Sequence, residues 1–212
     1  MKLSRQRSVS GFTMIEVLVV LVILMILMVF AFPALQGYVR RGKIEGAAKQ
    51  TALLLRSARM AALKTGGQRG PGGGSWTARA VVRLDPDRRE VLAFVDLDDD
   101  SGNPGSDLEY NPVDGEARTE TDHLLGRFAL PTDVEIGAFE RLTDRPDGTP
   151  VAVFLPDGSI ERSGAFRFED SRGNRLEVRV EPRATARVEV RKWNEDENAW
   201  LANGERGKTW SF

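Results

Sequence analysis

The hydrophobic pattern of the chain opens with one long apolar run. Within residues 12–35, the stretch from Val17 to Phe32 contains no polar side chain, and Glu16 is the one ionisable residue. At about 1.5 Å rise per residue, a helix over this run is roughly 36 Å long, enough to cross a bilayer core of about 30 Å. The pattern therefore predicts a membrane-spanning helix over residues 12–35.

Residues 36–65 are expected to continue this helix with an amphipathic pattern. The polar side carries Arg40, Lys43, Lys49, Gln50, Arg56 and Lys64. The apolar side repeats at helical spacing through Ile44, Ala47, Ala48, Thr51, Leu54, Leu55, Ala58 and Ala62. A stripe so rich in alanine favours close packing against a sheet.

A glycine-rich segment, residues 66–75, follows the predicted helix. Its composition disfavours regular structure, which indicates a loop or linker. A phosphate-binding loop is the alternative, but no Gly-Lys-Ser/Thr sequence follows, so the linker interpretation is favoured.

Residues 76–193 change to a β pattern. Trp76–Leu84 and Glu90–Asp96, joined by the turn at residues 85–87, predict a hairpin. Further strands are expected at Asp133–Phe139, Val151–Leu155, Ala165–Glu169, Arg175–Glu181 and Ala186–Trp193. We therefore expect an α+β fold, in which the long helix packs on an antiparallel β-sandwich head, followed by a C-terminal tail at residues 194–212.

Charged residues alternate with apolar ones in the last two predicted strands. Between Arg175 and Glu181 every second residue is charged, and the same parity recurs from Arg187 to Arg191. This pattern predicts half-buried antiparallel strands whose opposite charges face one another. The alternative is a phosphate-tracking stripe formed by Arg175, Arg179, Arg183, Arg187, Arg191 and Lys192. The interleaved glutamates favour a salt-bridged face, so nucleic acid is disfavoured as a partner without being excluded.

The start of the chain carries a basic leader. Met1 to Ser10 includes three cations and no acid. Cleavage after the apolar run would need a small-x-small site, and Pro33 interrupts the poor candidate there. Cleavage between Gly11 and Phe12 would instead leave the apolar helix at the new N-terminus. A signal anchor with an accidental Glu16 is the simpler alternative.

Gly11, Phe12 and Glu16 resemble the type IV prepilin leader and N-terminal methylation motif. The resemblance implies that a prepilin peptidase removes residues 1–11 and methylates Phe12. It also implies that Glu16 pairs with the N-terminal amine of a neighbouring subunit, and that Pro33 kinks the helix. Removal of the leader lowers the basic residues from 30 to 27, against 31 acidic ones.

The predicted head, with Phe154-Leu155-Pro156-Asp157-Gly158, resembles the H-type minor pseudopilins and FimT-like minor pilins. The resemblance implies a minor pseudopilin of a type II secretion system, with other major and minor pseudopilins and the inner-membrane secretion platform as partners. It places the helix once through the inner membrane and the head in the periplasm. A minor type IV pilin acting in pilus assembly, adhesion or DNA uptake is the alternative, because both systems share the leader and helix.

An acidic segment after the first hairpin is a candidate metal site. Asp96, Asp98, Asp100 and Asp107 have the alternating oxygen ligands of a calcium loop. Glycine falls one place late, Pro104 interrupts, and the twelfth position is Asp rather than Glu, so a solvated acidic loop is favoured over bound calcium.

The scarcity of histidine and cysteine side chains disfavours an enzymatic function. The chain has no cysteine, and its one histidine, His123, is expected in a polar loop. Trp193, Trp200 and Trp210 could form an aromatic binding patch, but closure of a core edge or a subunit contact is favoured. No cofactor other than calcium is indicated.

Overall fold

The computed structural model describes residues 13–65, 79–96, 108, 110, 122–137, 139–144, 149–207, 209 and 210. The chain divides into two compact units, residues 1–40 and 41–212, which are described separately. One helix, α1 (Met14–Thr65), contributes to both units. The second unit also holds two antiparallel sheets, so the α+β prediction is confirmed.

In the first unit, α1 presents apolar side chains on every side. Its most apolar 18-residue window has a mean hydropathy of 3.2, and none of that window is buried. By length and composition this helix can cross a membrane. The helix continues without interruption through residue 33. An unbroken helix can still bend at a proline, so the kink at Pro33 stays a prediction.

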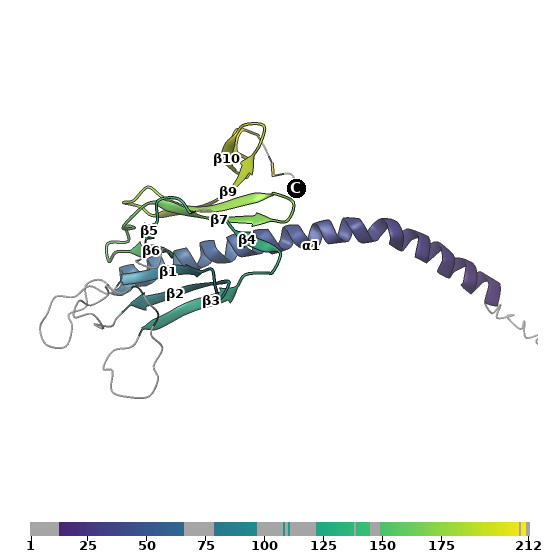
Figure 1. The fold of residues 1–212 in the computed structure, drawn as a ribbon, viewed down its shortest axis with the longest axis horizontal. Helices are drawn as coiled ribbons and strands as arrows, with labels where there is room; N and C mark the ends of the chain where they lie inside the picture. The colour runs from purple at the N-terminus through teal and green to yellow at the C-terminus, as the bar shows by residue number, and fades with distance from the viewer. Residues whose placement is uncertain are drawn as a thin grey trace, which may run out of the picture. The chain divides into compact units, whose positions relative to one another are not determined.

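Two sheets, each of five strands, form the second unit (Figure 1). Sheet A has the order β3-β2-β1-β6-β5 and sheet B the order β10-β9-β8-β7-β4, with antiparallel pairing throughout. Sheet A comprises β1 (Arg79–Asp85), β2 (Glu90–Asp96), β3 (His123–Ala129), β5 (Thr143–Asp144) and β6 (Pro150–Phe154). Sheet B comprises β4 (Val134–Ile136), β7 (Gly164–Asp170), β8 (Arg175–Glu181), β9 (Arg187–Asn194) and β10 (Ala199–Ala202). A short 3₁₀ helix, η1 (Glu205–Gly207), follows β10.

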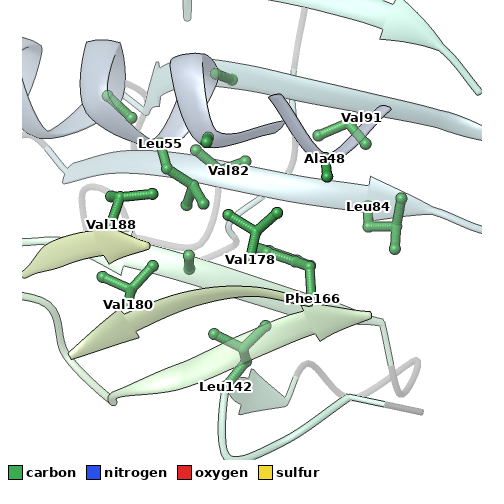
Figure 2. Packing of buried hydrophobic residues seen from close by; sticks show 14 of the residues in the cluster. Ala48, Leu55, Val82, Leu84, Val91, Leu142, Phe166, Val178, Val180 and Val188 are labelled. Atoms are coloured by element: carbon green, nitrogen blue, oxygen red, sulfur yellow. The ribbon is translucent and has the colours of Figure 1, made fainter. Parts of the chain in front are cut away.

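The main core joins the second part of α1 to the inner faces of both sheets. Figure 2 shows Ala48 and Leu55 of the helix with Val82 of sheet A and Val178 and Val180 of sheet B in one cluster. The predicted alanine-rich stripe supplies the helix side: Ile44, Ala47, Ala48, Thr51, Leu55, Ala58 and Ala62 are all buried. Small side chains let the helix approach both sheets closely, so the predicted packing of the helix on a sheet is confirmed.

A second cluster covers the opposite face of sheet A. Phe94 and Val153 belong to it, together with Leu108 and Tyr110 from the segment between β2 and β3. The rings of Phe94 and Tyr110 lie 5.6 Å apart at a tilted angle. Sheet A is therefore apolar on both faces, which explains why β2 is buried at six of its seven positions.

The turn after β6 fastens sheet A to the end of α1. Arg59 Nε donates a hydrogen bond to the carbonyl oxygen of Gly158 at 3.0 Å. Gly158 has a φ of 78°, and a Cβ there would lie 2.7 Å from a methyl group of Leu63. Asp157 closes the turn by accepting hydrogen bonds from the Ser159 amide and hydroxyl at 2.9 and 2.6 Å. The positive φ favours glycine at this position, and a larger residue would also have to displace the Leu63 side chain.

Most of the predicted strands occur within one or two residues of their expected ends. The hairpin is confirmed from Arg79 onward, while its predicted start at residues 76–78 and the glycine-rich loop predicted at residues 66–75 lie outside the described residues. The strand Arg175–Glu181 is confirmed, and the strand predicted from Asp133 is shorter, as Val134–Ile136. The expectation of a polar loop around His123 is wrong, because His123 begins β3 with its side chain exposed. Strands β3, β5 and β10 were not predicted. Strand β10 lies in the predicted C-terminal tail and extends sheet B.

Candidate functional site

The start of α1 places Glu16 in a defined local arrangement. Its carboxylate oxygen Oε2 accepts hydrogen bonds from the Thr13 amide at 2.8 Å and the Thr13 hydroxyl at 2.9 Å. The Glu16 amide in turn donates to the Thr13 hydroxyl oxygen at 3.4 Å. This reciprocal pair is a capping box, with Thr13 as the N-cap and Glu16 three residues later. Gly11 and Phe12 lie outside the described residues.

The capping box leaves Glu16 able to accept a further partner. Both Thr13 and Glu16 are exposed, and no cation contacts the carboxylate within the described part of the first unit. The two donors, one backbone amide and one hydroxyl group, are uncharged, so they do not neutralise a carboxylate that is placed in apolar surroundings. A cation from another molecule would satisfy the charge far better, because a buried ion pair costs much less than an isolated ion. The exposed carboxylate is accessible for such a pairing.

A second polar cluster lies on the outer face of sheet B. The Glu177 side chain is completely buried, and Arg167 and Arg179 both pair with it, with Nε–oxygen distances of 3.3 and 2.8 Å. Both arginines also pair with Glu140, which lies 2.7 Å from Arg179 Nη2. Two guanidinium groups paired with a buried carboxylate offset part of the cost of burying it. Glu177 is thus an exception to the half-buried pattern that the sequence predicted for β8.

The charged rows of β8 and β9 face one another in register. Glu177 is opposite Arg191, Arg179 opposite Glu189, and Glu181 opposite Arg187. Arg191 Nη2 lies 2.9 Å from Glu181 and 2.7 Å from Glu189. The predicted pairing of opposite charges is confirmed. Because these arginines are matched by carboxylates, the face offers little net charge to a phosphate backbone.

We expect this cluster to make the stability of the protein fall in acid. Burial alone would raise the pKa of Glu140, but the hydrogen bond from Arg179 and the charges of Arg179, Arg167 and Arg141 outweigh it and lower the pKa below 4.5. A carboxyl group with a lowered pKa stabilises the folded state above its unfolded pKa, and this contribution is lost as the pH falls through the folded value. Thermal melting of the full-length protein in detergent, at pH values from about 6 down to about 3, measures the loss.

Glu140→Gln is the matched variant for this pH experiment. It removes the titrating group while keeping the shape of the side chain. We expect the melting temperature of the variant to change less than that of the wild type below about pH 4.5. An identical acid dependence in the two proteins would show that Glu140 does not contribute.

The C-terminal tryptophans close the edge of sheet B. Trp193 and Trp200 are paired neighbours on β9 and β10, with ring centroids 5.3 Å apart in an edge-to-face arrangement. The Arg167 guanidinium lies 5.1 Å from the centre of the Trp200 ring. Trp210 packs against the main core and donates its indole N–H to the Leu201 carbonyl at 3.1 Å. Closure of a core edge or a subunit contact is the favoured prediction, and these contacts agree with closure of a core edge.

One of the four predicted calcium ligands lies among the described residues. Asp96 ends β2 and is completely buried, whereas Asp98, Asp100 and Asp107 lie outside the described residues. Among the residues with described positions, no group of three or more histidine, aspartate or glutamate side chains is arranged to hold a metal ion. The calcium loop therefore stays a prediction, testable by calorimetry with millimolar calcium.

Comparison with known families supports the interpretation of the N-terminus. The family model described as the prokaryotic N-terminal methylation motif matches residues 6–32, which include Gly11, Phe12 and Glu16. Comparisons with curated proteins and with solved structures gave no significant match. The motif indicates a type IV pilin-like protein, a class in which a prepilin peptidase and other pilin-like subunits are partners. Together with the apolar helix, it indicates membrane anchoring.

Proposed function

We propose that this protein is a minor pseudopilin of a type II secretion system. In this role it is a non-enzymatic subunit of a periplasmic pseudopilus that helps to move folded proteins across the outer membrane. The observation that carries the proposal is the placement of Glu16 at the start of an exposed apolar helix, within the matched methylation motif. Such a helix is suited to be drawn from a bilayer into a bundle of like helices.

The architecture of the second unit supports an H-type subunit. Two five-stranded antiparallel sheets enclose the alanine-rich part of α1, as the resemblance to this family implies. The turn at Pro156 to Gly158, which contributed to that resemblance, contacts α1 directly. The proposed division of the chain is a leader at 1–11, a transmembrane helix at 12–35, an amphipathic helix at 36–65, a glycine-rich loop at 66–75, a periplasmic head at 76–193 and a tail at 194–212.

Processing of the N-terminus is the first test. We expect the mature protein to begin with N-methylated Phe12, because the peptidase is proposed to cut after Gly11. Mass spectrometry of the protein purified from its native membrane checks both the mass and the N-terminal peptide. A mature chain that begins elsewhere, or keeps residues 1–11, would contradict the proposal.

Deletion of the gene distinguishes a pseudopilin from a type IV pilus subunit. We expect deletion to leave folded exoproteins in the periplasm while surface pili persist. Loss of pili with normal release of exoproteins would identify a pilus subunit. DNA binding by the full-length protein adds a second criterion, and tight, salt-dependent binding would favour the uptake role. The charge-matched outer face of sheet B supports weak binding.

A further inference from the structure

One end of sheet B carries a pocket that is separate from the start of α1. Its volume is about 350 Å³, and it lies between the β7–β8 turn and the β9–β10 hairpin. Small-molecule sites span about 300 to 1,000 Å³, so this pocket can hold a small ligand. The part of its lining used below consists of Arg172, Asn174, Trp193, Glu195, Asp196 and Trp210.

Local hydrogen bonds hold the walls of this pocket in place. Asp170 Oδ1 accepts from the amides of Arg172 and Asn174 at 2.9 Å each, and Oδ2 accepts from Asn174 Nδ2 at 2.9 Å. On the other side, the Trp210 indole N–H donates a hydrogen bond to the Leu201 carbonyl oxygen, and the Trp210 backbone amide donates to Asn203 Oδ1 at 3.3 Å. The pocket is therefore formed before any ligand arrives, which lowers the cost of binding.

Both donors and acceptors line the pocket. Arg172 offers N–H donors, Glu195 and Asp196 offer carboxylate acceptors, and Asn174 is an amide. Arg175 and Lys192 also line the pocket, but Arg175 pairs with Glu169 at 3.5 Å, and Lys192 has a partner of its own. Among the residues described, none pairs with the side chains of Arg172, Glu195 or Asp196 through an ion pair or hydrogen bond. An anion would meet two unpaired carboxylates here, a cation would meet three cationic side chains, and an apolar ligand would leave the unpaired groups unsatisfied.

Two indole rings complete the lining. Trp193 and Trp210 are both half-buried, so each combines a fixed position with an accessible surface. An indole presents an apolar face beside a polar edge. The ligand that matches this set has hydroxyl groups, which both donate and accept, and a compact ring with apolar C–H faces. We propose that this pocket binds an uncharged saccharide of one or two rings. The proposal is independent of the role in secretion.

Binding to the full-length protein tests the proposal. The protein is placed in phospholipid nanodiscs, because glycosidic detergents would compete for the pocket. The probes are glucose, galactose, N-acetylglucosamine and cellobiose, with galacturonate and inorganic phosphate as charged comparators. Saturation-transfer NMR and tryptophan fluorescence follow the titration. We expect at least one uncharged sugar to saturate with a Kd between about 0.1 and 10 mM.

Paired variants locate the site. Arg172→Ala and Asp196→Ala remove exposed side chains that line the pocket, and each is expected to weaken sugar binding by about tenfold. Arg162→Ala and Asp87→Ala remove exposed charges of the same types elsewhere and are expected to leave binding unchanged. Equal melting temperatures for the four variants confirm that they fold.

Three results would overturn the proposal. The first is the absence of saturable binding by the uncharged sugars up to about 50 mM. The second is equal sugar binding by the wild type and the two pocket variants. The third is tighter binding of galacturonate or phosphate than of any uncharged sugar, which would identify an anion site.

Discussion

Glu16→Ala is expected to exclude the protein from the filament while leaving its cleavage and membrane insertion intact. The substitution removes the carboxylate that is proposed to neutralise the N-terminal amine of an adjacent subunit. Without it, that amine would be buried unpaired among apolar helices, which is strongly unfavourable. We expect the assembled fraction to fall by about tenfold or more. Membrane fractionation, mass spectrometry and cross-linking to neighbouring subunits measure insertion, cleavage and assembly separately.

Thr13 provides the control for this experiment, because Glu16 also contributes to the capping box. Thr13→Val removes the hydroxyl but keeps the carboxylate, so it isolates the effect of a weaker helix start. Thr13→Ser retains the capping oxygen and should behave as the wild type. Assembly of Glu16→Ala at the level of the wild type would reject the pairing role. A defect of equal size in Thr13→Val would assign the effect to capping instead.

Gly164→Ala is expected to destabilise the second unit severely. A Cβ at this position would lie 2.2 Å from the Glu140 carbonyl oxygen and 2.8 Å from the Leu142 amide nitrogen. Both are backbone atoms, and the Glu140 segment is held by hydrogen bonds in both directions with Ala165 at 2.9 and 3.3 Å. The backbone would have to move apart, which costs about 3 kcal/mol by analogy with overpacked cores. For a domain of this size the melting temperature would fall by roughly 10 °C.

Gly46→Ala is the matched control for this stability measurement. The same methyl group is added, but apart from the adjacent helix backbone no atom of the described residues lies within 4 Å of its position on α1. Because alanine is the better helix former by about 1 kcal/mol, we expect the melting temperature to rise slightly. Circular dichroism of the full-length protein measures the melting temperature of each variant. Shifts of opposite sign in the two variants would confirm the steric argument. An unchanged melting temperature in Gly164→Ala would show that the segment adjusts freely.

Local pattern decided which elements could be predicted. Strand β8 is predicted correctly because its alternation of charged and apolar residues is strict. Strand β3 escaped detection for a physical reason: Ala93 and Phe94 of β2 pair with Gly126 and Leu124, so an extra residue interrupts the two-residue period. Strands β5 and β10 are too short to show a period.

The candidate site residues also differ in whether the sequence alone could predict them. Glu16 was identifiable because its motif is contiguous in the sequence. The role of Glu140 was not, since it lies 27 residues from Arg167 and 39 residues from Arg179, outside any predicted regular pairing. The close approach at Gly164 was equally hidden, because the atoms involved are backbone atoms of a segment more than twenty residues earlier. Contacts of this kind arise only from the tertiary arrangement.

The alternating charges of β8 and β9 also constrain how the hairpin can misalign. A slip of one position would turn the buried valines outward and the charges into the core. A slip of two positions keeps each side chain on its proper face, yet it would set Glu177 against Glu189 or Arg179 against Arg191. Like charges placed opposite each other repel. The alternating charges therefore disfavour a slip of two positions in either direction while β8 and β9 pair during folding.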